Sequence, residues 1–277
     1  MKNIRILFPE GKHKALTFSY DDGASTDREM VRILNGYGMK GTFNLNSGSF
    51  GKDYGDWKTP AGEYIRSLSR GELSALYAGH EIAVHGVSHG FWSAAPRERA
   101  LYDILEDRRA LEQIAGYPVR GLAYPFDAYD AGVREIVQAA GFRYARAAGR
   151  ERLFQLPHDP LRFDATCWHT DPDLMERAAA FLREDFNTNA LFCLAGHSFE
   201  FAMDGNWQVL DDFCKLTAGR EEVWYTTCIA VFDYLDAAKA LRFTADCSIV
   251  CNPTATRVFL DADGQTFSVG PGETVRI

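Results

Sequence analysis

The sequence lacks long apolar runs, paired-cysteine motifs and an excess of basic residues. No stretch approaches the ~20 apolar residues that a membrane-spanning helix needs. The apolar run near the N-terminus is too short for a signal peptide, and no small-residue cleavage site follows it. We therefore expect a cytoplasmic protein that does not enter the membrane.

The formal net charge is -8. Phosphate backbones and anionic lipid surfaces repel an acidic chain, so we expect neither nucleic acid nor membrane among its partners. The six cysteines never occur at CxxC spacing, and most have apolar neighbours. This pattern is typical of reduced core residues and argues against disulfides or a cysteine zinc site. The sequence does not indicate an oligomeric state.

Strand-like and helix-like segments alternate over most of the 277 residues, with no internal repeat. The strand-like segments are 15–20, 41–46, 81–86, 121–125, 142–145, 162–166, 191–195 and 223–227. Helical spacing of apolar residues predicts helices near 25–35, 96–115, 130–140, 172–184, 207–218 and 228–241. The alternation predicts a parallel sheet covered by helices. We expect a distorted TIM-like (β/α) barrel of seven or eight strands, with an open doubly wound sheet as the alternative.

The chain changes character after residue 241. Short β-rich runs follow, and Asp263-Gly264 is a typical tight hairpin turn. We predict a barrel domain over residues 1–241 and a small β-rich appendage over 242–277. A glycine-rich insert at 47–62 carries Phe50, Tyr54 and Trp57. These aromatic side chains could stack on a sugar ring or pack the loop onto the barrel, and the sequence favours neither.

Polar residues follow four predicted strands at the point where each strand ends. They are Asp21-Asp22, the pair His85 and His89, the segment Tyr124-Pro125-Phe126, and His197. Taken singly, each has a plain structural reading as a turn or as surface residues. In a barrel, however, the carboxyl ends of the strands share one face, so we expect these side chains to meet in one cleft.

The combined set offers two imidazoles and two carboxylates. His85, His89 and one aspartate would hold a divalent metal and leave an open position for water, as a hydrolytic metal requires. The other aspartate is then free for proton transfer, although spacing does not separate the two roles. The same ligand types also serve non-haem iron, so they do not identify the metal.

At these residues the chain resembles the polysaccharide deacetylase family, also called the NodB-homology family or carbohydrate esterase family 4. The segments that carry the resemblance are TFSYDDG (17–23), HGVSH (85–89), AYPF (123–126), Trp168 and LFCLAGH (191–197). The resemblance covers roughly residues 14–230. It implies a distorted TIM-like barrel and a metal-dependent hydrolase that removes an acetyl group from an N-acetylated or O-acetylated sugar, oligosaccharide or polysaccharide.

The resemblance also implies residue roles. Asp21 would be the general base and His197 the general acid, while Asp22, His85 and His89 would hold a divalent metal. Zn²⁺ is the first choice, with Co²⁺, Mn²⁺, Ni²⁺ or Fe²⁺ as alternatives. The remaining candidates would stabilise the oxyanion, in part through the backbone N–H of Phe126, or contact substrate: Tyr124, Pro125, Phe126, Trp168 and Glu200.

The chain departs from the family pattern in three places. Ala123 stands where the family has an arginine that orients the base, and the candidate substitute cations are Arg143, Arg146 and Arg162. The fourth motif is poorly matched, with Asp164 as a candidate for the carboxylate that tunes the acid histidine. In the segment after His197, Glu200 would pair with His197 or contact substrate. The alternative functions are hydrolysis of another small amide, cyclic imide or ureide on the same fold, and carbohydrate binding without catalysis.

Overall fold

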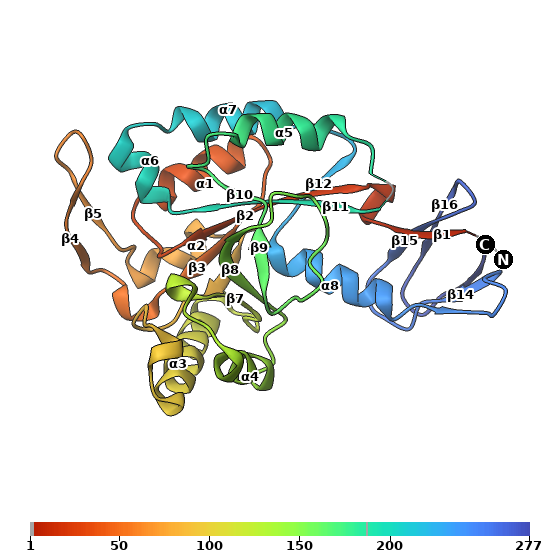
Figure 1. The fold of residues 1–277 in the computed structure, drawn as a ribbon, viewed down its shortest axis with the longest axis horizontal. Helices are drawn as coiled ribbons and strands as arrows, with labels where there is room; N and C mark the ends of the chain where they lie inside the picture. The colour runs from red at the N-terminus through yellow and green to blue at the C-terminus, as the bar shows by residue number, and fades with distance from the viewer. Residues whose placement is uncertain (1–2, 187) are drawn as a thin grey trace.

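A single parallel sheet forms the centre of the molecule (Figure 1). The computed structural model describes residues 3–186 and 188–277. Along the sheet the strands run in the order β10 (Cys167–Trp168), β11 (Ala190–Gly196), β2 (Lys14–Asp21), β3 (Thr42–Leu45), β6 (Glu81–Val84), β7 (Gly121–Ala123), β8 (Tyr144–Arg150) and β9 (Phe163–Ala165). Strand β12 (Val223–Tyr225) pairs with the first half of β2.

The two ends of this sheet are joined by one short segment. Strands β9 and β10 are separated only by Thr166, yet β9 pairs with β8 and β10 pairs with β11, both in parallel. Thr166 bridges the junction, because its N–H donates to the carbonyl of Cys193 and its hydroxyl accepts from the Cys193 N–H. The nearly closed ring of parallel strands confirms the predicted distorted TIM-like barrel.

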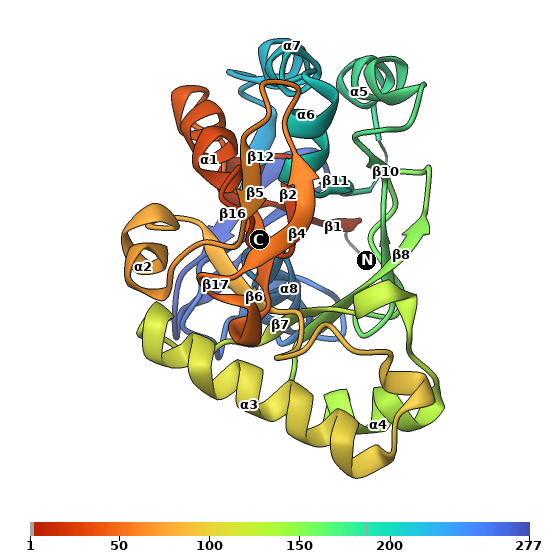
Figure 2. The ribbon, with the colours of Figure 1, turned by 90° about the vertical axis from the view of Figure 1, so that its left-hand side faces the viewer.

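Helices surround the ring, as Figure 2 shows for the view toward the β4–β5 side of the molecule. They are α1 (Asp27–Gly36), α2 (Leu73–Leu76), α3 (Arg97–Ala115), α4 (Ala131–Ala139), α5 (Leu174–Arg183), α6 (Ser198–Asp204), α7 (Gln208–Thr217) and α8 (Cys228–Lys239). The largest hydrophobic cluster lies between strands and helices; for example, Phe18 packs edge-on against Phe213 of α7. No helix within the described ranges is long and apolar enough to cross a bilayer.

Alternation along β2 explains why polar residues occupy the inside of the barrel. Phe18 points outward to the helices, while Ser19 accepts hydrogen bonds from Asn44 and Arg146 of other barrel strands. Successive side chains of a strand point to opposite faces, so Asp21 shares the inner face with Ser19. The first strand therefore delivers a carboxylate to the open end of the barrel.

Helix α8 closes the opposite end. The N–H of Ile229, in its first turn, donates to Glu81 of β6, and the N–H of Cys228 donates to the hydroxyl of Thr42. Thr42 and Tyr144 also donate hydroxyl hydrogen bonds to Glu81. Burial raises the pKa of Glu81 to about 7 although these three hydrogen bonds favour the charged form.

The glycine-rich insert after β3 is a hairpin rather than a loop. Strands β4 (Asp53–Lys58) and β5 (Tyr64–Arg66) pair antiparallel with a register shift and project from the barrel, at the left of Figure 1. Trp57 lies on Phe199 at 4.9 Å between ring centroids and close to Tyr54 at 5.9 Å, yet it keeps 43% of its surface exposed. It thus packs the insert onto the barrel and also presents an aromatic face.

Two small antiparallel sheets lie at the other end of the molecule, near both termini (Figure 1). One contains β13 (Arg242–Phe243), β14 (Ile249–Cys251) and β17 (Thr274–Arg276), and the other contains β1 (Ile4–Leu7), β15 (Val258–Ala262) and β16 (Gln265–Val269). Asp263 and Gly264 form the turn from β15 to β16, both with positive φ. The N-terminal strand thus belongs to the β-rich end, and the division at residue 241 stays a prediction.

Candidate functional site

The polar residues predicted at the strand ends converge on one cavity of about 370 Å³ at the carboxyl end of the barrel. Its lining is Asp21, Asp22, Trp57, His85, His89, Tyr124, Phe126, Arg146, Ala148, Trp168, His197, Phe199 and Glu200. Pro125 is buried and does not line this cavity. Sequence reasoning did not include Phe199, which follows His197 closely, and it named Trp57 only as part of the insert.

Three potential metal ligands point at one another in this cavity. Oδ1 of Asp22 lies 3.7 Å from Nε2 of His85 and 3.5 Å from Nε2 of His89, and the two imidazole nitrogens are 3.1 Å apart. Asp22 and His89 both have positive φ, at 78° and 49°. Such backbone conformations are costly for residues with a side chain and concentrate at functional sites.

His85 is fixed in one orientation by its other ring nitrogen. Nδ1 lies 2.8 Å from the carbonyl oxygen of Ala123, which can only accept, so Nδ1 carries the proton. Nε2 is then the nitrogen with a free lone pair, and it faces His89 and Asp22. An imidazole held this way is prepared to be a metal ligand.

The His85–His89 segment is a loop that helix α3 holds in place. Asp107 accepts hydrogen bonds from the backbone N–H groups of Ser47, His85 and Gly86, at 2.7, 3.1 and 2.9 Å. Asp103 accepts from Ser88 in the same loop and from the indole of Trp92. Sequence reasoning missed both carboxylates, although they fall on the inward face of α3.

Gly86 is required at its position in this loop. Its φ is 82°, and a Cβ there would lie 2.5 Å from Oδ2 of Asp103 and 2.7 Å from the Trp92 ring. Any larger residue would separate the histidine loop from the helix that orients it.

Asp21 is paired with Arg146. The guanidinium contacts both carboxylate oxygens and also donates to Ser19, while Asn44 donates to Oδ1 of Asp21 at 2.8 Å. Burial alone would raise the pKa of Asp21, but Arg146 outweighs it, with the nearby histidines, and holds that pKa well below its usual range. Asp21 is therefore ionised at neutral pH.

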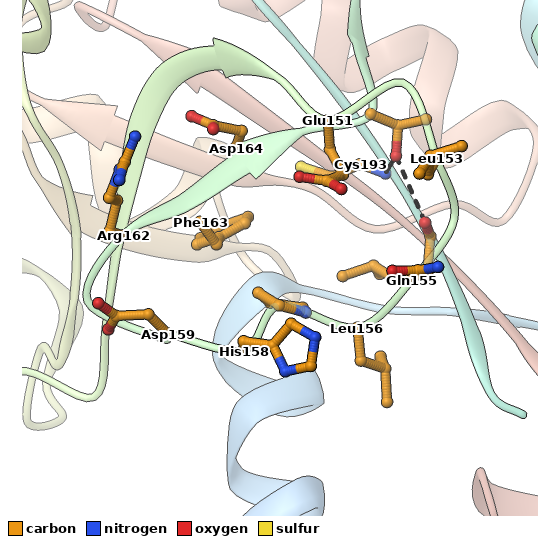
Figure 3. A pocket seen from close by; sticks show the side chains of 13 residues that line it. Glu151, Leu153, Gln155, Leu156, His158, Asp159, Arg162, Phe163, Asp164 and Cys193 are labelled. Carbon is orange, nitrogen blue, oxygen red and sulfur yellow. Dashed lines mark hydrogen bonds between the residues drawn. The ribbon is translucent and has the colours of Figure 1, made fainter.

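Of the three candidate cations, Arg146 is the one that contacts Asp21. Its Cα is the register partner of Ala123 on the neighbouring strand. Arg143 instead pairs with Asp236 of α8. Arg162 lines a second cavity, of about 300 Å³, together with Asp164 (Figure 3). Asp164 accepts from the N–H of Gly149 and does not line the cavity that holds His197.

His197 follows β11 and caps α6. Its Nε2 lies 3.9 Å from Oδ2 of Asp22 and its Nδ1 lies 3.4 Å from Oε2 of Glu200. Its ring packs beside Trp168 and Phe199, with centroids at 5.6 and 4.9 Å. Burial opposes the charged ring, but Glu200 and the two aspartates outweigh it, so the pKa of His197 is raised.

Phe126 forms one edge of the cavity. It adopts a left-handed conformation with φ 53°, stacks on Phe91 at 4.1 Å and forms a T-shaped contact with His89 at 4.2 Å between centroids. More than half of its surface is exposed. The neighbouring Tyr124 donates its hydroxyl to the carbonyl of Leu161, so its ring rather than its hydroxyl is offered to the cavity.

Comparisons with known proteins agree with this architecture. The model of a family described as polysaccharide deacetylase matches residues 9–145. A structure from Mycobacterium smegmatis named as a polysaccharide deacetylase has a TM-score of 0.60 at 18% identity, covering 86% of this chain and 96% of the other. No curated protein matches the chain.

Two further solved structures share the fold. PuuE allantoinase has a TM-score of 0.62 at 13% identity, covering 82% of this chain and 91% of its own. A carbohydrate esterase domain of a multidomain xylanase from the hindgut metagenome of Trinervitermes trinervoides has a TM-score of 0.52 at 16% identity, covering 82% and 92%. At these identities the likeness concerns the fold alone.

Proposed function

Because this chain belongs to the polysaccharide deacetylase family, we propose that it is a metal-dependent hydrolase that removes an acetyl group from an N-acetylated or O-acetylated sugar or oligosaccharide. One observation carries the proposal: a carboxylate and two imidazoles converge within 4.8 Å of one another. A second carboxylate, Asp21, and a third imidazole, His197, line the same cavity. This is the set of groups that acyl hydrolysis needs.

The donor set fits a divalent cation. Ligand atoms around a tetrahedral Zn²⁺ with bonds of ~2.0–2.1 Å lie about 3.3 Å from one another. The separations among Asp22, His85 and His89 are 3.1 to 3.7 Å. Three protein ligands leave room for water and substrate, and a cation held there would polarise the acetyl carbonyl and make water more acidic.

Asp21 and His197 are suited to the two proton transfers of the reaction. Asp21 is ionised and lies 3.9 Å from Nε2 of His85, so it is suited to take a proton from the attacking water. His197, with its raised pKa, is suited to donate a proton to the leaving amine or alcohol. Phe126 lines the cavity, and the family resemblance supports the proposal that its backbone N–H faces the oxyanion.

The cavity walls favour a sugar-like substrate. Trp57, Phe126, Trp168 and Phe199 supply flat aromatic surfaces on several sides. The apolar C–H face of a pyranose stacks on such surfaces. Among the described lining residues the only lysine or arginine is Arg146, which Asp21 already neutralises. A neutral acetylated sugar therefore suits the cavity better than an anionic substrate.

Hydrolysis of a small amide, cyclic imide or ureide is the second candidate. A cavity of about 370 Å³ could hold such a molecule whole, and an allantoinase shares the fold. Acetate release separates the two, since ring opening of a ureide liberates none.

The test combines metal analysis with an acetate-release assay on N-acetylglucosamine oligomers. We expect one divalent cation per chain and release of acetate. Asp21→Asn should keep the metal and lose release by about 10²–10⁴-fold, the usual contribution of a general base. His85→Ala should lose the metal.

His158→Ala is the control, because His158 lines the other cavity (Figure 3). It should retain both metal and activity. Full metal occupancy in His85→Ala, or unchanged release by Asp21→Asn, would reject the assigned roles. A metal-loaded protein that releases no acetate from any sugar but opens a ureide would favour the second candidate.

A further inference from the structure

One buried imidazole near the cavity has no part in the proposed reaction. His169 follows β10 with only 5% of its surface exposed and lies against the ring of Phe201, at 3.9 Å between centroids. Its ring plane is nearly parallel to that of Tyr20, with centroids 5.6 Å apart. Burial lowers the pKa of His169 to about 4, so the ring is neutral at physiological pH.

The neutral ring can hold its proton on only one nitrogen, and its neighbours determine which. Nε2 of His169 lies 3.3 Å from Oε2 of Glu200, and Nδ1 lies 3.2 Å from the hydroxyl of Tyr20. A carboxylate oxygen only accepts, so the proton is on Nε2 and Tyr20 donates to Nδ1. His169 therefore fixes the position of the Glu200 carboxylate.

The same oxygen of Glu200 contacts His197 twice. Oε2 accepts from the backbone N–H of His197 at 3.3 Å and lies 3.4 Å from Nδ1 of its ring. The backbone contact lies at the start of α6, where His197 is the N-cap residue and Glu200, three residues later, accepts from its N–H as the glutamate of a capping box does. One carboxylate oxygen thus joins the two imidazoles, His169 and His197.

The strand before His197 is shaped around His169. Gly196 lies so close to it that a Cβ would fall 2.0 Å from Nδ1 of His169. The backbone N–H of His169 also donates to the carbonyl of Ala195. Glycine at position 196 is therefore needed for the imidazole to reach Glu200, which is an observation independent of the side-chain contacts.

We propose that Glu200 and His169 are positioning residues for His197, and this inference rests on the proposed function. The carboxylate keeps a proton on Nδ1 of His197 and turns Nε2 toward Asp22, where the leaving group would be protonated. In that step the N–H bond forms on the leaving nitrogen as its bond to the acetyl carbon breaks, and His197 is left neutral with its proton on Nδ1.

The dependence of rate on the leaving group tests this role. An N-acetyl sugar must be protonated as it leaves, whereas 4-nitrophenyl acetate releases a stable phenolate without an acid. Glu200→Gln keeps an acceptor oxygen for the backbone N–H of His197, since glutamine is also found at this position of a helix start. We expect it to lower kcat for the amide about 10- to 100-fold with little change in KM, as loss of such a partner typically does. Aryl ester turnover should stay within about threefold.

His169→Phe keeps the stacking and removes both ring nitrogens. We expect kcat for the amide to fall, again without a matching fall in aryl ester turnover. The double variant should have a kcat no more than about tenfold below that of Glu200→Gln, because the effects of residues in one network do not add. Glu176→Gln, an exposed glutamate in the first turn of α5, is the matched control and should behave as wild type.

Two results would overturn the inference: equal losses of amide and ester turnover in Glu200→Gln, or no loss of either. Imidazole ¹⁵N shifts provide a readout without turnover, and Glu200→Gln should change the shifts and proton occupancy of the His197 ring. Unchanged signals would contradict the positioning role even if wild type is active. A wild-type protein inactive on both substrates, with the shift change present, would instead count against the proposed function.

Discussion

Arg146 contacts Asp21 from the strand next to the one where the family pattern has an arginine. Ala123 leaves no side chain to reach Asp21, but its register partner on β8 points into the barrel at the same level. Arg146 is almost fully buried and contacts both oxygens of Asp21. Asp22 follows the end of β2 in a left-handed conformation, so its carboxylate faces the two histidines and not Arg146.

Arg146→Ala should abolish measurable deacetylation, because it leaves a buried carboxylate unpaired, at a cost of about 3–5 kcal/mol in stability. Arg146→Lys keeps the charge but loses the planar fork, so we expect kcat about 10- to 100-fold lower with metal content unchanged. Arg143→Lys, at the ion pair with Asp236, is the control. Steady-state kinetics and metal analysis provide the measurement.

A swap variant makes the test sharper. Ala123→Arg combined with Arg146→Ala returns a guanidinium to the same level of the barrel from the neighbouring strand. We expect at least about a tenfold gain over Arg146→Ala alone, since both positions face Asp21. Wild-type activity in Arg146→Ala would show that the base needs no cation.

At the scale of elements, helix α3 positions the histidine loop. Its inward face carries Asp103 and Asp107, which accept from the loop N–H groups of Ser88 and Gly86. The hairpin β4–β5 acts from the other side, where Trp57 reaches the cavity. Both elements bring side chains to the barrel mouth without belonging to the barrel strands.

Asp107→Asn should weaken metal binding. The amide replaces one acceptor oxygen of the carboxylate with an NH₂ donor. This donor faces backbone N–H groups, so at least one of them loses its acceptor, which costs about 1–3 kcal/mol of stability. We expect a metal affinity about 10- to 100-fold lower in a competition titration with a chelator. Asp130→Asn, the N-cap of α4, should leave metal affinity unchanged. Equal metal affinities in Asp107→Asn and Asp130→Asn would show that Asp107 of α3 does not contribute to metal binding.

At the scale of the whole molecule, one end of the barrel is closed and the other carries the candidate site. Glu81 ties β6, β3 and β8 to the first turn of α8. The β-rich end lies beyond α8, where Tyr234 donates to the carbonyl of Leu7 and accepts from the N–H of Phe259. The cavity is thus built on a base that several distant segments hold together.

Glu81 should make stability depend on pH. The folded protein keeps this proton up to about pH 7, while the unfolded chain loses it near the ordinary value of 4.5. The unfolded state binds fewer protons in that window, so the stability contribution falls as pH rises from about 4.5 to 7 and is constant above. The shift corresponds to about 3 kcal/mol.

Glu81→Gln removes the titration and keeps the size of the side chain. The free energy of unfolding of wild type relative to this variant should fall by about 2–3 kcal/mol between pH 5 and 8, measured with urea. Glu98→Gln, on the exposed surface of α3, should show no such trend. If the difference in free energy of unfolding between wild type and Glu81→Gln did not change with pH, the raised pKa of Glu81 would be contradicted.

The periodicity of apolar residues along the sequence predicted much of the structure of this protein. Apolar alternation and helical spacing predicted the barrel and its helices, because both periodicities are properties of neighbouring residues. The strand-end rule led to Asp21, Asp22, His85, His89 and His197 as one group, since parallel strands expose their carboxyl ends on one face. The insert at 47–62 was predicted to be a loop, because its glycines obscure the strand pattern of the hairpin.

Tertiary structure alone decided which side chains pair. The contact of Arg146 with Asp21, the hold of Asp107 on the histidine loop, and the path from His169 through Glu200 to His197 join residues of different elements. Strand register, helix rotation and backbone conformation set these distances, and none of them is a local property of the chain. Sequence therefore supplied the chemical groups, and the closed barrel determined their partners.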